Sequence, residues 1–208
     1  MLEMYNELYL MRHGETAWNR AHRHQGWLDS PLTARGQAQA RAMGVWLVGE
    51  IAGRTDLAAF TSPQGRAMET AALVFAKTGL SPRPDDRLKE VAFGAWEGLL
   101  HEEVRAGWPW VVDAIEREGF LWHFLSPGGE TYEDLRQRAE AFLQDLNGPA
   151  IVIAHGVLLR VLRAVWHGLT EYDLAAMSGG QGVIFHLRLG HEERRIVPPG
   201  APPRHEPG

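Results

Sequence analysis

The sequence predicts an α/β fold, with a mostly parallel sheet covered by helices on both faces. Two observations predict it. Short apolar runs typical of buried strands are each followed by a longer segment with helical spacing of its apolar residues, and this alternation occurs three times. The chain of 208 residues is also 45% hydrophobic and 23% charged, which suits one domain with a sizeable core.

The first two strand–helix pairs lie in the N-terminal third of the chain. Residues 8–11 form a short apolar run that predicts a buried strand. The helix that follows is expected within residues 29–53, where Thr33 can cap it. Residues 57–62 predict the second strand, and residues 65–77 the second helix.

The third pair gives the strongest signal of the three. Residues 150–155, "AIVIAH", are the most strand-like run in the chain, and residues 156–168 predict the helix after it. A further helix before this strand should be capped by Thr131, with Asp134 three residues later. Residues 182–189 predict a last strand.

Two segments do not follow this alternation. Residues 98–127 are rich in tryptophan and phenylalanine and predict a small cap of short helices inserted into the domain. Residues 190–208 are rich in proline and glycine and predict a flexible tail. We therefore expect residues 1–208 to form a single domain with one insert and one tail.

Composition excludes several classes of function. The net charge of −5 gives no basic field for nucleic acid or an anionic membrane. With no cysteine, the chain has no disulfide, thiol nucleophile or thiolate metal site. No run is long and apolar enough to span a bilayer, and the first residues do not resemble a secretion signal. We expect a cytoplasmic protein, monomeric or homodimeric.

Polar groups of one chemical kind follow all three predicted strands. Arg12 and His13 follow the first strand, Arg66 opens the helix after the second, and His155 follows the third. Because ligands bind beyond the carboxyl ends of parallel strands, these side chains should meet at one edge of the sheet. Arginine forks and helix N-termini suit the oxygens of a phosphoryl group, so this edge predicts an anion site.

Several motifs then point to one family. The stretches "LYLMRHGETAWN", "TSPQGRAMETA", "LKEVAFGAWEG" and "IVIAHGVLLRVL" occur in this order along the chain. Together they resemble the histidine phosphatase superfamily, also called phosphoglycerate mutase-like, and its phosphatase branch in particular. The resemblance implies a doubly wound α/β fold and a phosphohistidine intermediate. It also implies a small phosphorylated metabolite as the substrate, with no metal and no cofactor.

The resemblance assigns roles to individual residues. His13 would be the nucleophile and Glu90 the proton donor to the leaving oxygen. Arg12, Arg66 and His155 would hold the phosphoryl oxygens and spread the charge of the transition state. The expected substrate-binding residues are Asn19, Gln25, Gly26 and Gly156.

A metal site is the weaker interpretation of the histidines. His22 and His24 form an H-x-H pair, and two more histidines lie in the insert. A zinc site needs three or four convergent ligands, and no such set is evident in the sequence.

Two other functions stay open beside phosphomonoester hydrolysis. One is a 2,3-bisphosphoglycerate-dependent phosphoglycerate mutase, and the other is a non-catalytic module that binds phosphorylated ligands. Mutases of this family take basic groups largely from the segment after the proton donor. Here residues 91–127 hold only Arg105 and Arg117 as cations. This predicts a phosphatase for a monoester with an uncharged or apolar body.

Overall fold

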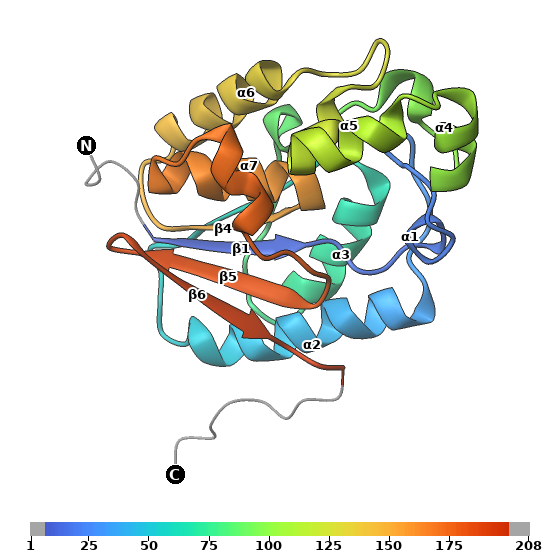
Figure 1. Ribbon diagram of the computed structural model, residues 1–208. Coiled ribbons are helices and arrows are strands. Elements are labelled where there is room, and N and C mark those ends of the chain that lie inside the picture. Colours follow the sequence, from blue (N-terminus) through green and yellow to red (C-terminus); the bar gives the residue numbers. More distant parts are fainter. Residues whose placement is uncertain (1–6, 200–208) are drawn as a thin grey trace.

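The computed structural model describes residues 7–199, and a six-stranded sheet lies at its centre (Figure 1). The strands lie side by side in the order β3-β2-β4-β1-β5-β6. Their bounds are β1 (Leu8–Arg12), β2 (Ala58–Thr61), β3 (Arg83–Pro84), β4 (Ala150–Ala154), β5 (Val183–Arg188) and β6 (His191–Ile196).

The sheet is mostly parallel, as the alternation of elements predicts. β1 and β2 both pair in parallel with β4, and β2 also pairs in parallel with β3. β5 runs antiparallel to β1, and β6 runs antiparallel to β5. The crossovers that parallel pairing requires are made by the helices on the two faces of the sheet.

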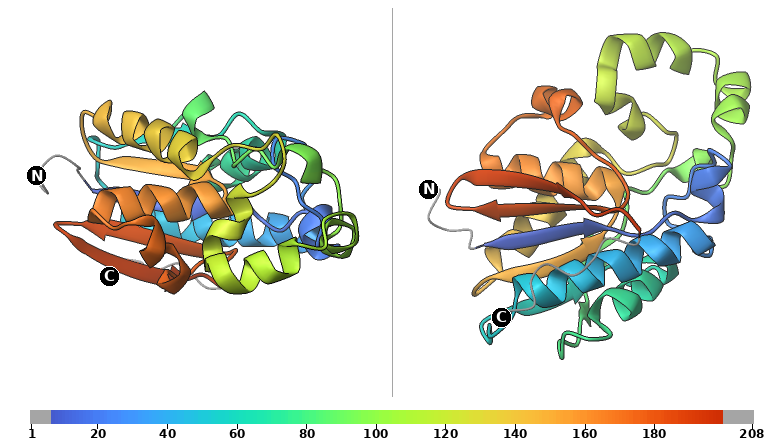
Figure 2. Two further views of the ribbon diagram at one scale, coloured as in Figure 1. Left: turned by 45° about the horizontal axis from the view of Figure 1, so that its top comes forward. Right: turned by 90° about the horizontal axis from the view of Figure 1, so that it is seen from below.

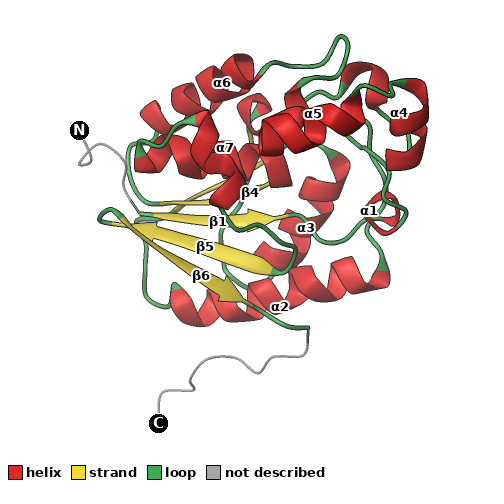
Figure 3. Ribbon diagram, in the orientation of Figure 1, coloured by secondary structure: helices red, strands yellow, loops and turns green. Residues whose placement is uncertain are grey.

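Helices cover both faces of the sheet, as the ribbon coloured by secondary structure in Figure 3 shows. On one face lie α2 (Ala34–Glu50) and α3 (Gly65–Phe75), and on the other lie α6 (Tyr132–Gln144) and α7 (Gly156–His167). Alternate residues of each central strand supply the two cores. In β1, Tyr9 and Met11 join the core under α2 and α3, whereas Leu8 joins the core under α6 and α7.

The predicted helix starts are confirmed. The Thr33 hydroxyl accepts a hydrogen bond from the Gly36 N–H at 3.0 Å and caps α2. At α6, the Thr131 hydroxyl and the Asp134 carboxylate each accept a hydrogen bond from the other residue's backbone N–H. Such caps satisfy N–H groups that have no partner inside the helix, which fixes where each helix begins.

The tryptophan-rich insert forms a layer of short helices beyond the sheet, as predicted. It contains α4 (His101–Gly107), α5 (Val111–Glu118) and the 3-10 helix η4 (Gly119–Phe124). The right-hand view of Figure 2 shows this cap standing out from the body of the domain. The remaining short elements are α1 (Ala17–Arg20) and the 3-10 helices η2 (Asp86–Leu88), η3 (Gly94–Trp96) and η5 (Glu171–Ala176).

The expectation of a flexible tail from residue 190 is wrong for its first part. Residues His191–Ile196 form β6 and pair with β5 along its whole length. Five of the six residues of this strand are polar, as is common for an edge strand, so composition alone does not indicate a strand here. Residues 200–208 lie outside the described residues. Between residues 7 and 199, no helix combines the length and apolar character that crossing a bilayer requires.

Candidate active site

The ends of β1 and β4 bring two histidines together. Arg12 pairs with Ala154 in the parallel register, so both strands end at the same edge of the sheet. The next residue, His13, donates its backbone N–H to the Ala154 carbonyl at 2.9 Å. The rings of His13 and His155 then lie with their centroids 5.1 Å apart. The sheet thus places these side chains at one point, as the sequence predicts.

The ring of His13 is buried and held in one orientation. Its Nδ1 lies 2.8 Å from the Gly14 carbonyl oxygen. Because a carbonyl can only accept, Nδ1 carries the hydrogen and Nε2 keeps a free lone pair. Burial, together with the charges of Arg12 and Arg66, holds the pKa of His13 well below its ordinary value of 6.5. The ring is therefore neutral near pH 7.

Arg12 reaches across the first turn of α7. A Cβ atom on Gly156 would lie 3.0 Å from the Arg12 Cζ, so only a glycine leaves the guanidinium its present place. The Nε of Arg12 is buried and has no hydrogen-bond partner within the described chain. Glycine at position 156 therefore lets an arginine and a helix N-terminus share the same small volume.

Arg66 is fixed by the loop that follows α1. Its Nη1 donates to the Leu28 carbonyl at 2.8 Å and pairs with Asp29 at 3.1 Å, and its Nη2 donates to the Gly26 carbonyl at 2.9 Å. The side chain is almost fully buried. Gly26 thus binds Arg66 through its carbonyl and also lines the pocket, where its contact with the substrate stays a prediction.

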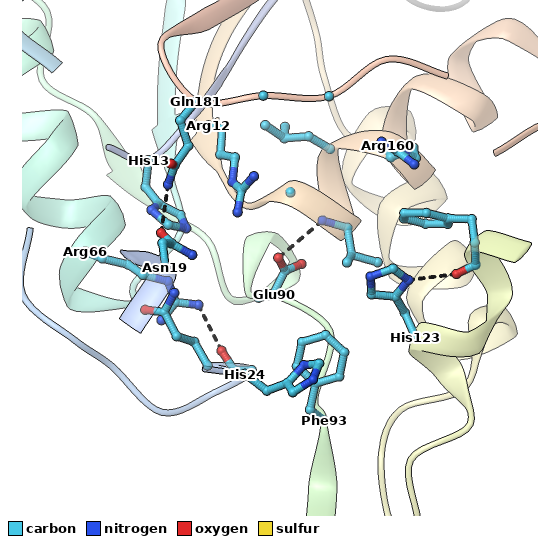
Figure 4. A pocket seen from close by; sticks show the side chains of 18 of the residues that line it. Arg12, His13, Asn19, His24, Arg66, Glu90, Phe93, His123, Arg160 and Gln181 are labelled. Atoms are coloured by element: carbon cyan, nitrogen blue, oxygen red, sulfur yellow. Dashed lines mark hydrogen bonds between the residues drawn. The ribbon is translucent and has the colours of Figure 1, made fainter. Parts of the chain in front are cut away.

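The carboxylate of Glu90 takes the place of an N-cap for α7. Oε1 accepts hydrogen bonds from the N–H groups of Val91 at 3.1 Å and Leu158 at 3.0 Å, and Oε2 accepts one from Val157 at 3.2 Å. His155, the N-cap residue, makes no such bond with its side chain. These hydrogen bonds hold Glu90, a residue of an irregular loop, at the pocket that His13 also lines (Figure 4).

The backbone of Glu90 is itself held by a partly buried ion pair. Arg138 on α6 binds Glu130 through Nε at 2.6 Å, and donates to the carbonyls of Lys89 at 2.6 Å and Glu90 at 3.0 Å. The Glu130 carboxylate also accepts the Ala92 N–H at 3.2 Å. Glu130 therefore orders the loop that presents Glu90.

His155 is completely buried, and neither of its ring nitrogens has a partner among residues 7–199. Burial, and then the charges of Arg66, His13 and Arg12, holds its pKa well below 6.5. A buried ring with an unused N–H is a donor that is ready for an anionic oxygen.

Asn19 and Gln25 also line the pocket, and their side chains are held by neighbours. The Asn19 Oδ1 accepts a hydrogen bond from Gln181 Nε2 at 2.7 Å, so its amide nitrogen is the group left for a ligand. The Gln25 Oε1 accepts from the Thr16 hydroxyl at 3.1 Å. Gln181 itself was not expected from the sequence, because it lies 162 residues after Asn19.

Eight of the nine expected residues line one pocket of about 630 Å³. The ninth, His155, is not part of the lining, and its buried ring lies 5.1 Å from the ring of His13. Several other residues of this pocket were not predicted from the sequence. Arg160 and Arg163 follow Gly156 by four and seven positions, which puts all three on one face of α7. The far wall contains aromatic and histidine side chains: His24, Phe93, His101, Phe120 and His123.

The histidines of the far wall do not make a metal centre. His24 stacks on His101 with ring centroids 4.3 Å apart, and its Nε2 is buried. Burial lowers the pKa of His24 to about 3 and that of His123 to about 4. Within residues 7–199, no three His, Cys, Asp or Glu side chains are placed to hold a metal ion together.

The sequence of residues 8–200 matches the model of the histidine phosphatase superfamily, branch 1. The chain belongs to this superfamily. It is 36% identical over 192 residues to a 2,3-bisphosphoglycerate-dependent phosphoglycerate mutase of Methylobacterium radiotolerans, covering 88% of this chain and 89% of the relative. It is 32% identical over 198 residues to a glucosyl-3-phosphoglycerate phosphatase of Mycobacterium tuberculosis, covering 88% and 85%.

Solved structures agree with this membership. YhfR of Bacillus stearothermophilus superposes with a TM-score of 0.75 at 32% identity, covering 92% of this chain and 96% of that one. A mycobacterial glucosyl-3-phosphoglycerate phosphatase, solved with VO3, gives a TM-score of 0.73 at 29% identity, covering 94% and 100%. The chain is therefore an enzyme of the histidine phosphatase type, and phosphomonoester hydrolysis is the activity that its family supports.

Proposed function

We propose that the enzyme hydrolyses a small phosphomonoester through a phosphohistidine on His13. The observation that carries the proposal is the orientation of this ring, whose Nδ1 is fixed by the Gly14 carbonyl. Nε2 attacks phosphorus, so that a P–N bond forms and the P–O bond to the leaving group breaks. Glu90 gives its proton to the leaving oxygen.

The second step returns the enzyme to its starting state. Glu90, now a carboxylate, takes a proton from water, whose oxygen attacks phosphorus while the P–N bond breaks. Inorganic phosphate leaves, and His13 is neutral again. In this proposal Arg12 and Arg66, which line the pocket, and the N–H of the buried His155 bind the phosphoryl oxygens in both steps. Groups that are placed before the reaction stabilise the transition state without reorganisation during transfer.

A phosphoglycerate mutase is the second candidate, because relatives of this type match as well as phosphatases do. The composition of the cap supports hydrolysis. The residues from segment 91–127 that line the pocket are Phe93, His101, Phe120 and His123, and neither Arg105 nor Arg117 is among them. A cytoplasmic location, a monomeric or homodimeric state and a single domain over residues 1–208 stay predictions from the sequence.

The test combines a covalent trap with an assay of products. Acid-sensitive, alkali-stable phosphate should appear on His13 after rapid quenching of turnover, and His13→Ala should lose both this label and the activity. Phosphate release from p-nitrophenyl phosphate and other monoesters should be efficient. Full activity in His13→Ala would overturn the mechanism. Isomerisation of 3-phosphoglycerate that requires 2,3-bisphosphoglycerate, with negligible phosphate release, would establish the mutase instead.

A further inference from the structure

Arg160 lies in the pocket but has no part in the proposed chemistry. It sits on α7, four residues after Gly156, and Figure 4 places it beside His123 on the opposite side of the pocket from His13. Its guanidinium carbon lies over the Phe120 ring, 4.1 Å from the ring centroid. The aromatic face supports the guanidinium from one side and does not use its N–H donors.

The hydrogen bonds of Arg160 are few. Nη1 donates to the Leu174 carbonyl at 3.4 Å, which is a long contact, and Nε has no partner within the described chain. Arg163, one turn later on α7, behaves differently. Its Nε binds the Glu192 carboxylate at 2.8 Å, its Nη2 binds the other oxygen, and Nη1 binds the Ser178 carbonyl at 2.7 Å.

The positive charge of Arg160 is therefore not neutralised by the protein. Among residues 7–199 it forms no ion pair, whereas Arg23, Arg66 and Arg163 of the same pocket each have a carboxylate partner. Burial and the nearby charges of Arg163 and Arg12 lower its pKa, as expected for a cation among cations. Since Arg12 serves the phosphoryl group, Arg160 is left for another part of the substrate.

We propose that Arg160 binds a carboxylate on the body of the substrate, so that the enzyme selects phosphomonoesters of small hydroxy acids. The proposal rests on the proposed function, because it assigns the phosphoryl group to the His13 side of the pocket. A planar carboxylate matches a guanidinium with unused donors, and Arg163 and Arg138 show this pairing elsewhere in the chain.

This inference revises the expectation of an uncharged substrate body. That expectation rested on the small number of cations in residues 91–127, the segment from which mutases of the family take their basic groups. Here the available cation comes from α7 instead, and the cap contributes the Phe120 ring on which it stacks. The pocket then has two anion-binding ends, and Val157 and Leu159 of α7 add apolar side chains to its lining.

Gly179 offers a second way to test the same group. A Cβ atom at this position would lie 3.0 Å from the Arg160 Nη2, with no other heavy atom as near. Gly179→Ala should push the flexible end of Arg160 aside while its charge is kept. Gly107→Ala is the matched control, because the added methyl group meets nothing within 4 Å.

The experiment compares 3-phosphoglycerate with glycerol 3-phosphate, which has a hydroxymethyl group in place of the carboxylate. Both Kd values are measured by calorimetry on the His13→Ala background, so that binding is read without turnover. The first ligand should bind more tightly. Adding Arg160→Gln should reduce this preference by about 10- to 100-fold, the worth of one charge-assisted hydrogen-bonded pair. Arg160→Lys should retain part of it, Gly179→Ala should reduce it, and Gly107→Ala should not.

The outcomes separate the two proposals. Equal affinity for the two ligands, or a preference that survives Arg160→Gln, would overturn the carboxylate site whatever the enzyme's activity. Absence of phosphate release from every monoester, p-nitrophenyl phosphate included, would overturn the proposed hydrolysis. A carboxylate preference that depends on Arg160 would still be measured in that case.

Discussion

Replacing Glu90 by glutamine separates its role as a proton donor from its role as a cap of α7. Glutamine keeps one oxygen, which can still accept from Val91 and Leu158 as Oε1 does. Its NH₂ group then faces the Val157 N–H, which now meets Oε2 at 3.2 Å. One buried donor is left without an acceptor, which should destabilise the fold by about 1–3 kcal/mol.

The catalytic loss should depend on the leaving group. An alkyl alkoxide needs a proton as it departs, so the rate on glycerol 3-phosphate should fall by about 100- to 10,000-fold, the usual contribution of a general acid. 4-Nitrophenolate leaves without protonation. The rate on p-nitrophenyl phosphate should therefore fall only by the smaller factor that comes from displacement of site residues when the N-terminus of α7 loses one hydrogen bond.

The assay is the ratio of kcat/KM on the two substrates, measured for both proteins below the melting temperature of the variant. A structural disturbance lowers both rates together and cancels in this ratio, whereas a lost proton donor does not. Urea unfolding of both proteins measures independently how much stability is lost when the Val157 N–H has no acceptor. If the two substrates lose activity by the same factor, Glu90 only shapes the site and the proton must come from elsewhere.

Three further predictions use other parts of the site. Gly156→Ala should displace the Arg12 guanidinium, whose Cζ lies 3.0 Å from the added Cβ, and lower kcat by about 100-fold. The control Gly107→Ala should leave kcat unchanged, because its added Cβ meets nothing within 4 Å. An unchanged kcat in Gly156→Ala would show that the arginine has room to move. Chelators should leave the rate unchanged and vanadate should inhibit, whereas activity lost in chelator and restored by zinc would show a metal site. The folded-state pKa values of His13 and His155 lie below 6.5, chiefly through burial, so the unfolded chain takes up protons that the folded chain does not. Stability should therefore fall as the pH drops below 6.5, by about 1.4 kcal/mol per pH unit for each ring, and urea titrations of His155→Gln should show a smaller slope.

The sequence was sufficient to predict the positions of those site residues that directly follow a regular strand. Arg12, His13 and His155 follow parallel strands, whose carboxyl ends must share an edge, so their meeting follows from topology. Glu90 lies in an irregular loop, and only its motif drew attention to it. Its true anchor, the N-terminus of α7, has no signature in sequence because the contacts are made to backbone N–H groups.

Other residues were missed for two different reasons. Arg160 could have been found, because its spacing from Gly156 puts both on one helical face. Gln181 could not, because nothing local indicates that a loop before the last strands returns to α1 to bind Asn19. β6 was hidden because the edge strand of a sheet needs only backbone pairing, and its polar side chains are typical of an exposed segment.

An ion pair joins the edge strand β6 to α7, and its arginine is one of the residues that line the pocket. Glu192 neutralises Arg163, a buried arginine of the pocket wall, while Arg160 on the same helix stays uncompensated. A single acidic residue on a peripheral hairpin thus neutralises one of the two arginines that α7 adds to the pocket wall. A neutral residue at position 192 would leave the Arg163 guanidinium without its carboxylate partner and would change the charge of the pocket with every catalytic motif intact.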